Sequence, residues 1–280
     1  MLLHEAIEAA GMTPPRQMVP GRWLRFPGTG KGLSNRSGWC RIITPTVAIY
    51  GDWSSGLSAV WRDDSHVDDE ESRRQLERAR AREREFARAQ VAKQEEVAQL
   101  ASKMIRQAKL GTHPYLAAKG FPNEPGLVHG INLLVPMRDA ITYGTVVNVQ
   151  QITPDGTKRF LTGGRAGGAV FCLSPQNARH TVLCEGYATG LSIDNAVRLL
   201  PGPSRVNVCF SAFNLERVAR HFRGAVVAAD NDLSGTGERA AVATGLRWTM
   251  PYEVGTDFND LHVSIGLHAV VERMRTLIMT

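Results

Sequence analysis

Five carboxylates follow apolar, strand-like segments in the C-terminal part of the chain. Glu185 follows TVLC, and Asp230 and Asp232 follow GAVVAA. Asp257 and Asp260 come shortly after RWTMPYEV. Carboxylate oxygens are preferred ligands of Mg²⁺, which is usually held by a few such oxygens together with substrate phosphates. The acids therefore predict a divalent-metal site that acts on phosphate groups.

The spacing inside AADND matters more than the number of acids. If this segment is extended, Asp230 and Asp232 lie on the same side and both can reach one ion. The alternative is that such acids cap the following helices or begin turns, and for Asp232 alone the two interpretations balance. The set favours the metal site, because three acidic clusters that each follow a strand are hard to explain by capping.

The elements that must position these acids alternate between strand and helix patterns. This order is typical of an α/β fold, in which a parallel sheet is joined by crossover helices and functional groups gather at the carboxyl ends of the strands. We predict strands at 181–186, 205–210 and 224–232, and helices at 188–200, 214–222 and 235–246.

The preceding segment is mixed in character. A short helix over 113–121 ends at Gly120, and two strand-like runs follow at 131–137 and 145–152. The Asp155–Gly156 dipeptide predicts a turn that reverses the chain into KRFLTGG, so we expect a hairpin there.

The N-terminal part has two further regions. Residues 21–61 mix aromatic, glycine and β-branched residues, which predicts a small β-rich domain. From Asp68 to about Lys109 the chain lacks Gly and Pro and is rich in Arg, Glu, Gln and Ala, which predicts one long linking helix. A solvated helix is favoured over a nucleic-acid-binding one, because its charges nearly cancel. The expected domains are 1–66, 67–110, 111–178 and 179–280.

Composition sets wider bounds. The 280 residues are 43% hydrophobic and 21% charged, which suits a folded protein of two or more domains. No apolar run is long enough to cross a bilayer, and the acidic start MLLHEAIEAAGM does not resemble an export signal, so we expect a cytoplasmic protein without a membrane partner. The net charge of +6 favours a polyanionic partner, although charge alone is weak evidence for nucleic acid.

Two other candidate sites are weak. The cysteines form no CxxC pair, so zinc is not expected, and the thiols at Cys184 and Cys209 fit a reduced core. FPGTGKGL has Arg25 and Gly32 at two positions that a phosphate-binding loop of the GxxxxGK[ST] type requires to be Gly and Ser/Thr. The N-terminal tryptophans can stack on single-stranded bases, but we favour a role in the domain core. These are Trp23, Trp39, Trp53 and Trp61.

The motif series CEGYATGLSI, VVAADNDLSGTGERAA and GTDFNDLH resembles the Toprim domain over about residues 180–275. That resemblance implies that Glu185 is an acid/base or metal-proximal carboxylate. It also implies that Asp230, Asp232 and one of Asp257 or Asp260 bind Mg²⁺, with Mn²⁺ as an alternative ion. EGYATGLSIDNA and DFNDL are similar to the primases of plasmids and phages in particular.

The upstream segment LLVPMRDAITYGTVVNVQQITPDGTKRFLTGG resembles the basic subdomain that precedes Toprim in bacterial-type primases. By position, the resemblance implies that Lys158, Arg159 and Arg165, with Arg138 as a weaker candidate, contact template or nucleotide phosphates. An ordinary solvated hairpin is the alternative for any one of these cations.

Together the resemblances imply a DNA primase of a phage, plasmid or other mobile element. Such an enzyme makes short RNA primers from nucleoside triphosphates on a single-stranded DNA template. This chain departs from the pattern in lacking zinc-ribbon ligands and a helicase motif, so a separate replicative helicase is an expected partner. A Mg²⁺-dependent Toprim nuclease and a non-catalytic accessory protein that binds single-stranded DNA or docks a partner are the alternatives. A topoisomerase is disfavoured, because it needs a tyrosine nucleophile in a separate large domain.

Overall fold

The computed structural model describes residues 1–63, 70–173 and 177–279. The predicted helix start at Asp68 lies outside these residues, as does the predicted boundary between residues 66 and 67. The chain divides into two compact units, Met1–Gln90 and Val91–Thr280. Within the described part of the chain, no helix has both the length and the hydropathy of a membrane span.

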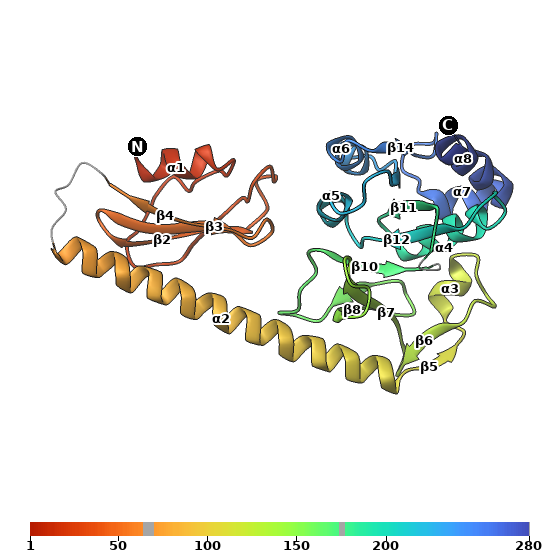
Figure 1. Cartoon of the computed structure of the whole chain (residues 1–280), viewed down its shortest axis with the longest axis horizontal. Coiled ribbons are helices and arrows are strands. Elements are labelled where there is room, and N and C mark those ends of the chain that lie inside the picture. Colours follow the sequence, from red (N-terminus) through yellow and green to blue (C-terminus); the bar gives the residue numbers. More distant parts are fainter. Residues whose placement is uncertain (64–69, 174–176, 280) are drawn as a thin grey trace. The chain divides into compact units, whose positions relative to one another are not determined.

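The first unit is built on an antiparallel sheet with the strand order β1-β2-β3-β4 (Figure 1). The predicted β-rich character of this region is confirmed. A short helix, α1, covers one face through Leu3, Ala6 and Ile7, although the sequence analysis assigned no helix there. The elements are α1 (Leu3–Ala9), β1 (Leu24–Phe26), β2 (Gly38–Thr44), β3 (Val47–Asp52) and β4 (Leu57–Arg62).

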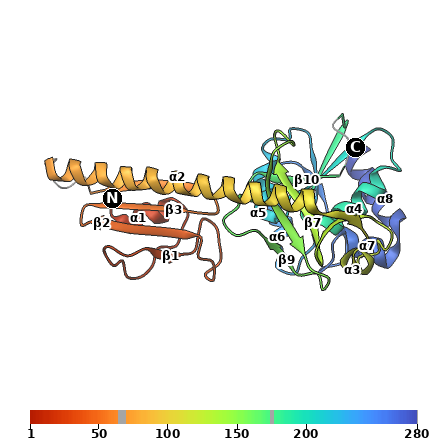
Figure 2. The same cartoon turned by 90° about the horizontal axis from the view of Figure 1, so that it is seen from below.

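The predicted long helix is present as α2 (Glu70–Gln107), one continuous element in Figures 1 and 2. Its composition of good helix formers without Gly or Pro accounts for its length. The boundary between the two units falls within this helix, so Phe86 belongs to the first unit, and Val97 and Ala101 to the second. Val97 and Ala101 are buried there, and Ala101 packs with Leu134 and Val149.

The second unit begins with antiparallel strands. The predicted hairpin is confirmed, since β8 and β9 pair with Ile152 opposite Lys158 and Gly156 adopts a positive φ of 87° in the turn. The short helix α3 begins at Pro114 and is capped by His113, whose ring accepts a hydrogen bond from the backbone N–H of Tyr115. The elements are β5 (Lys109–Gly111), α3 (Pro114–Ala118), β6 (Gly126–His129), β7 (Asn132–Asp139), β8 (Val146–Ile152), β9 (Lys158–Phe160) and β10 (Ala169–Cys172).

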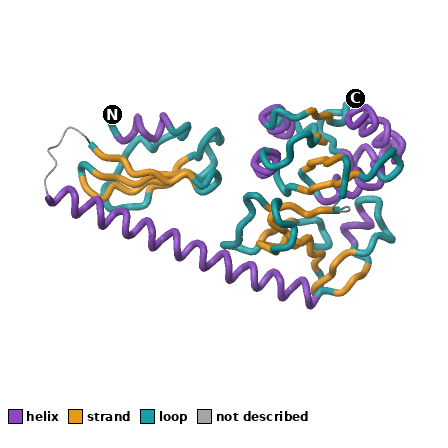
Figure 3. Tube along the Cα trace, viewed as in Figure 1, coloured by secondary structure: helices purple, strands orange, loops and turns teal. Residues whose placement is uncertain are grey.

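The remainder of the unit has the predicted α/β class, with parallel strands in the order β14-β13-β11-β12 and helices on both faces (Figure 3). The strands are β11 (His180–Cys184), β12 (Ser204–Val208), β13 (Val226–Ala228) and β14 (Arg247–Thr249). The helices are α4 (Tyr187–Val197), α5 (Ala212–Ala219), α6 (Thr236–Ala243), α7 (Phe258–Ile265) and α8 (Leu267–Met279).

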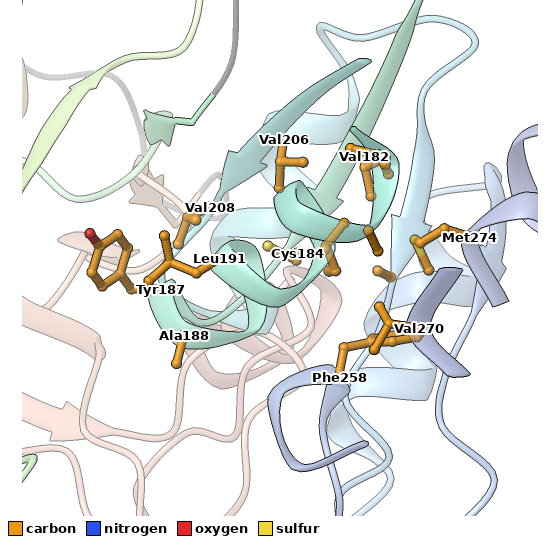
Figure 4. Packing of buried hydrophobic residues seen from close by; sticks show 14 of the residues in the cluster. Val182, Cys184, Tyr187, Ala188, Leu191, Val206, Val208, Phe258, Val270 and Met274 are labelled. Atoms are coloured by element: carbon orange, nitrogen blue, oxygen red, sulfur yellow. The ribbon is translucent and has the colours of Figure 1, made fainter. Parts of the chain in front are cut away.

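Alternating strand residues divide the core between the two faces of this sheet. Val182 and Cys184 pack with α4, α7 and α8, and Figure 4 shows this cluster with Phe258 and Met274. Leu183, between them in sequence, packs on the other face with α5 and α6. This period of two is expected for a sheet buried on both sides.

Strand β10 connects the two parts of the unit. It pairs antiparallel with β7 on one side and with β12 on the other, so the antiparallel and parallel strands form one ten-stranded sheet. The predicted basic hairpin and the predicted acidic strand ends therefore belong to a single hydrogen-bonded framework.

Candidate active site

Glu185 follows β11 directly, as the strand pattern predicts. Its backbone carbonyl accepts a hydrogen bond of 2.8 Å from the N–H of Phe210, which adopts a positive φ of 69° just after β12. The ends of these two neighbouring strands are thus tied together at the acid. Burial, followed by the negative charge of Asp232, raises the pKa of the Glu185 carboxyl to about 7.

Asp230 comes after β13, which is the other parallel neighbour of β11. Burial, followed by the negative charges of Glu185 and Asp257, raises its pKa to about 8 against the opposing effect of the Lys158 ammonium. Its Oδ1 atom is buried and has no hydrogen-bond partner among the described residues. A carboxyl oxygen left in this state is costly, and a bound cation can relieve the cost.

Gly237 supports the backbone of Asp230. A Cβ atom at this position would lie 2.2 Å from the Asp230 carbonyl oxygen, so only glycine allows α6 to approach the strand end so closely. The GTGERAA segment that follows the two acids therefore has a packing role in addition to forming a helix.

Asp232 is turned toward the N-terminus of α6. Its carboxylate accepts hydrogen bonds from the backbone N–H groups of Gly237 at 2.7 Å, Ser234 at 2.9 Å and Thr236 at 3.2 Å, and from the Ser234 hydroxyl. Desolvation of the Asp232 carboxyl raises its pKa, but the hydrogen bonds from these donors have the larger combined effect and lower the pKa to about 2. The helix-capping interpretation describes this geometry well, and the negative charge still acts on Glu185.

Asp257 and Asp260 form a reciprocal cap at the start of α7. The Asp257 Oδ1 atom accepts from the N–H groups of Asn259 at 2.6 Å and Asp260 at 2.9 Å, while Asp260 Oδ2 accepts from the Asp257 N–H at 3.0 Å. Of these two acids, Asp257 is the one whose negative charge raises the pKa of Asp230. Asp260 instead lies 3.7 Å from the Lys119 ammonium. Asp257 is thus the member of the pair that belongs electrostatically to the strand-end acids.

Of the predicted cations, Lys158 is the one coupled to the acids. Its ammonium lies 5.7 Å from the centre of the Tyr115 ring. The residue is exposed as a whole, yet protein atoms surround its charged end: burial and then the ammonium of Lys119 lower its pKa, against the opposing effects of Asp257 and Asp230. A partly desolvated ammonium next to carboxylates is suited to binding a phosphate.

The other three predicted cations have different surroundings. Arg159 follows Lys158 in β9, so its side chain points to the opposite side of the strand. Arg165 forms an ion pair of 2.7 Å with Asp139, and Arg138 donates a 3.0 Å hydrogen bond to the carbonyl of Gly144. The structure therefore does not gather all four cations beside the acids.

Sequence reasoning missed Lys119, Tyr115 and Thr189. Lys119 reaches the site because its carbonyl accepts a 2.9 Å hydrogen bond from the side chain of Asn259, which attaches α3 to α7. Thr189 of α4 donates to Asp257 Oδ2. Both contacts join segments far apart in the chain, and no local spacing signals them.

The described residues contain no group of three His, Cys, Asp or Glu side chains arranged to hold a metal ion. The reason is that the carboxylates of Asp232 and Asp257 face the backbone N–H groups at the starts of α6 and α7. The donor chemistry nevertheless fits Mg²⁺, because Asp230 presents an unpartnered oxygen beside Glu185, and this ion is commonly held by one or two carboxylates plus substrate phosphates.

No family model matches the chain. In fold, part of the chain is similar to solved DNA primases. The primase fragment of the bacteriophage T7 primase-helicase protein aligns with a TM-score of 0.39 and 15% identity over 52% of this chain and 64% of that chain. A DNA primase domain from Pseudomonas aeruginosa gives 0.37 and 13%, over 60% and 56%.

A third structure, the DnaG primase catalytic domain bound to ssDNA, gives a TM-score of 0.37 and 14% identity, over 60% of this chain and 57% of that chain. This chain therefore spans less than two thirds of each of the three. The likeness concerns fold alone, and we base the functional proposal on the residues of the site.

Proposed function

We propose that this chain is a DNA primase, a nucleotidyltransferase that makes short RNA primers on single-stranded DNA from nucleoside triphosphates. The observation that carries the proposal is the carboxyl of Asp230. Its Oδ1 atom is buried without a hydrogen-bond partner in the described part of the chain, and the charges of Glu185, Asp257 and Lys158 all act on it. Acids of this kind bind divalent metal, and cations next to them bind phosphate. The Toprim-like motif series gives the reaction class.

In this proposal Asp230 and Glu185 hold Mg²⁺ or Mn²⁺, with Asp257 and Asp232 adding negative charge around them. When bound, the metal would offset the charge that develops on the triphosphate during nucleotidyl transfer. Asp232 keeps the loop before α6 in place through its backbone hydrogen bonds. Asp257 likewise accepts backbone hydrogen bonds at the start of α7, and its hydrogen bond from Thr189 holds that helix against α4.

Lys158 and Lys119 supply the positive charge. Each approaches the acids from the antiparallel half of the unit, and together they are suited to orient the phosphates of an incoming nucleotide. The pKa of about 7 belongs to Glu185 in the metal-free site, and a bound divalent cation would favour its charged form, as a metal ligand requires. Arg138 of β7 and Arg165, in the loop between β9 and β10, are proposed to contact the template backbone.

The proposal includes a biological context. The similarity of EGYATGLSIDNA and DFNDL to plasmid and phage primases supports a mobile element, and we propose that a separate replicative helicase supplies the unwinding activity. Stimulation of primer synthesis by an added replicative helicase of a phage or plasmid would test that partnership, and an unchanged rate would contradict it.

The decisive experiment incubates the chain with mixed-sequence single-stranded DNA, labelled nucleoside triphosphates and Mg²⁺, and separates the products by length. We expect new short oligomers that disappear with EDTA and with Asp230→Asn. Glu216→Gln is a matched control, because Glu216 lies on α5 and pairs with Arg220. Shortened template without new oligomers would instead identify a nuclease, and neither product together with strand binding would identify an accessory protein.

A further inference from the structure

The two faces of the first unit's sheet differ in what covers them. Phe26 and Cys40 pack with α1 on one face. Since side chains alternate along a strand, Trp39 and Arg41 of β2 lie on the other face. The register places Arg25 of β1 directly opposite Trp39, so this second face combines aromatic and basic side chains.

The aromatic residues of this face form a cluster with Phe86 of α2. We call it the tryptophan cluster and define it as Trp23, Trp39, Trp53 and Phe86. The ring centres are 5.4 Å apart for Trp23 and Trp39, 5.4 Å for Trp39 and Trp53, and 5.1 Å for Trp53 and Phe86. Trp23 and Phe86 remain 43% and 42% exposed. The cluster is therefore continuous and open to solvent at both of these rings.

This cluster is poorly suited to serve only as a core. The indole Nε1 atoms of Trp39 and Trp53 are buried, and neither has a hydrogen-bond partner in the described part of the chain. A buried donor without an acceptor costs about 1–3 kcal/mol. In contrast, Trp61 on the α1 side donates its indole N–H to the carbonyl of Met1 at 2.9 Å. Aliphatic side chains would fill the second face without this cost.

Two arginines cover parts of the cluster. The guanidinium carbon of Arg25 lies 5.1 Å from the centre of a Trp53 ring, and that of Arg41 lies 5.7 Å from a Trp23 ring. Two acids of the unit are held by other groups: Asp52 accepts hydrogen bonds from Ser54 and Thr29, and Glu83 accepts one from the Ser58 hydroxyl. The exposed rings of Trp23 and Phe86 thus offer stacking beside positive charge, whereas Trp39, at 5% exposure, supports them from below.

We propose that the tryptophan cluster, with Arg25 and Arg41, is a binding site for single-stranded nucleic acid. Unpaired bases stack on aromatic rings irrespective of sequence, and arginine neutralises the phosphates between them. A duplex is a poorer fit, because its bases are stacked on one another and its surface offers only phosphates to this face. The site goes beyond the proposed function, because it requires neither the strand-end acids nor a metal.

The test measures binding of a fluorescently labelled oligothymidylate to the full chain by anisotropy, with EDTA present to prevent synthesis or cleavage. Stacking of one base contributes about 1–3 kcal/mol, so Trp23→Ala should raise Kd by about 5- to 150-fold. Arg25→Gln and Arg41→Gln should weaken binding and reduce its dependence on salt concentration. Trp23→Phe, which keeps an aromatic face, should recover part of the affinity even if the alanine variant is less stable.

Arg16→Gln is the matched control, because it removes one exposed charge from the same unit outside the cluster. It should bind like the parent chain, and a duplex of equal length should bind more weakly than the single strand. Unchanged binding by Trp23→Ala and Arg25→Gln would overturn the proposal, as would an equal loss with Arg16→Gln. Asp230→Asn separates the two proposals, because it should bind oligothymidylate normally even though it makes no primers.

Discussion

The hydroxyl of Thr189 donates a 3.0 Å hydrogen bond to the carboxylate of Asp257. Thr189 lies in α4, the helix that follows Glu185, while Asp257 caps α7. This one bond connects the element behind the first acid to the element that carries the last. It holds Asp257 against α4, whereas Asp260 accepts a hydrogen bond from the Asp257 N–H and lies 3.7 Å from the Lys119 ammonium.

We predict that Asp257→Asn reduces primer synthesis by about 10- to 100-fold, as is usual when an oriented partner of a metal site is lost. Asp260→Asn should retain most activity. Asparagine caps helices as well as aspartate does, so both variants should keep α7 and unfold within a few degrees of the parent. Activity assays with a thermal melt check this, and equal losses in the two variants would contradict it.

Asp230→Asn should stabilise the metal-free protein at high pH. The folded-state pKa values of Glu185 and Asp230, about 7 and about 8, lie above the ordinary values of 4.5 and 3.8. The folded state therefore binds more protons than the unfolded state between these limits, and the free energy of unfolding falls as pH rises through that range.

Asparagine at position 230 cannot ionise, so the free energy of unfolding of the variant falls less as pH rises. We expect a gain on the order of 1–3 kcal/mol at pH 9 and a smaller one at pH 5, measured by denaturant unfolding in EDTA. Added Mg²⁺ should stabilise the parent chain more than the variant. An equal effect at both pH values would show that the carboxyl of Asp230 is not held in the way described.

Lys158→Gln should weaken use of nucleoside triphosphates by about 10- to 150-fold, the range expected for loss of a charge-assisted hydrogen bond to phosphate. Arg159→Gln removes the same charge from the other side of β9 and should change the rate only slightly. Steady-state kinetics with varied nucleotide concentration distinguish the two. A greater effect from Arg159 would move the phosphate site to the opposite side of the hairpin.

Gly237→Ala should disturb both Asp230 and Asp232. The new methyl group would meet the carbonyl oxygen of Asp230, so the backbone must shift at a cost of about 1–3 kcal/mol. Gly144→Ala is a suitable control, because the nearest atom to its Cβ is 3.8 Å away. Unfolding and primer synthesis should both be impaired in the first variant and nearly normal in the second.

Much of the fold could be predicted from local patterns. The alternation of strands and helices gave the α/β class, and the parallel neighbours β11 and β13 do carry Glu185 and Asp230 at their ends. The Asp155–Gly156 turn and the long helix were also readable, because each depends on residues close together in the chain. Helix α1 is only seven residues long and was overlooked.

The detailed site could not be predicted in this way. The orientation of Asp232 depends on how the loop 232–237 folds back on its own amides, which the two-residue spacing does not reveal. Lys119 enters the site through Asn259, 140 residues away in sequence. The ion pair of Arg165 with Asp139 likewise arises from tertiary packing. A single sequence shows which groups are present more readily than which way they face.

The position of β10 has a consequence for how this unit can change through evolution. Because it hydrogen-bonds to β7 on one side and β12 on the other, recombination that replaced only one half would leave mismatched strand edges at the junction. We therefore expect the basic and acidic halves to stay together when the sequence changes. Among the described strands, those of the first unit form a separate sheet, so such a mismatch would not arise from a change in that sheet.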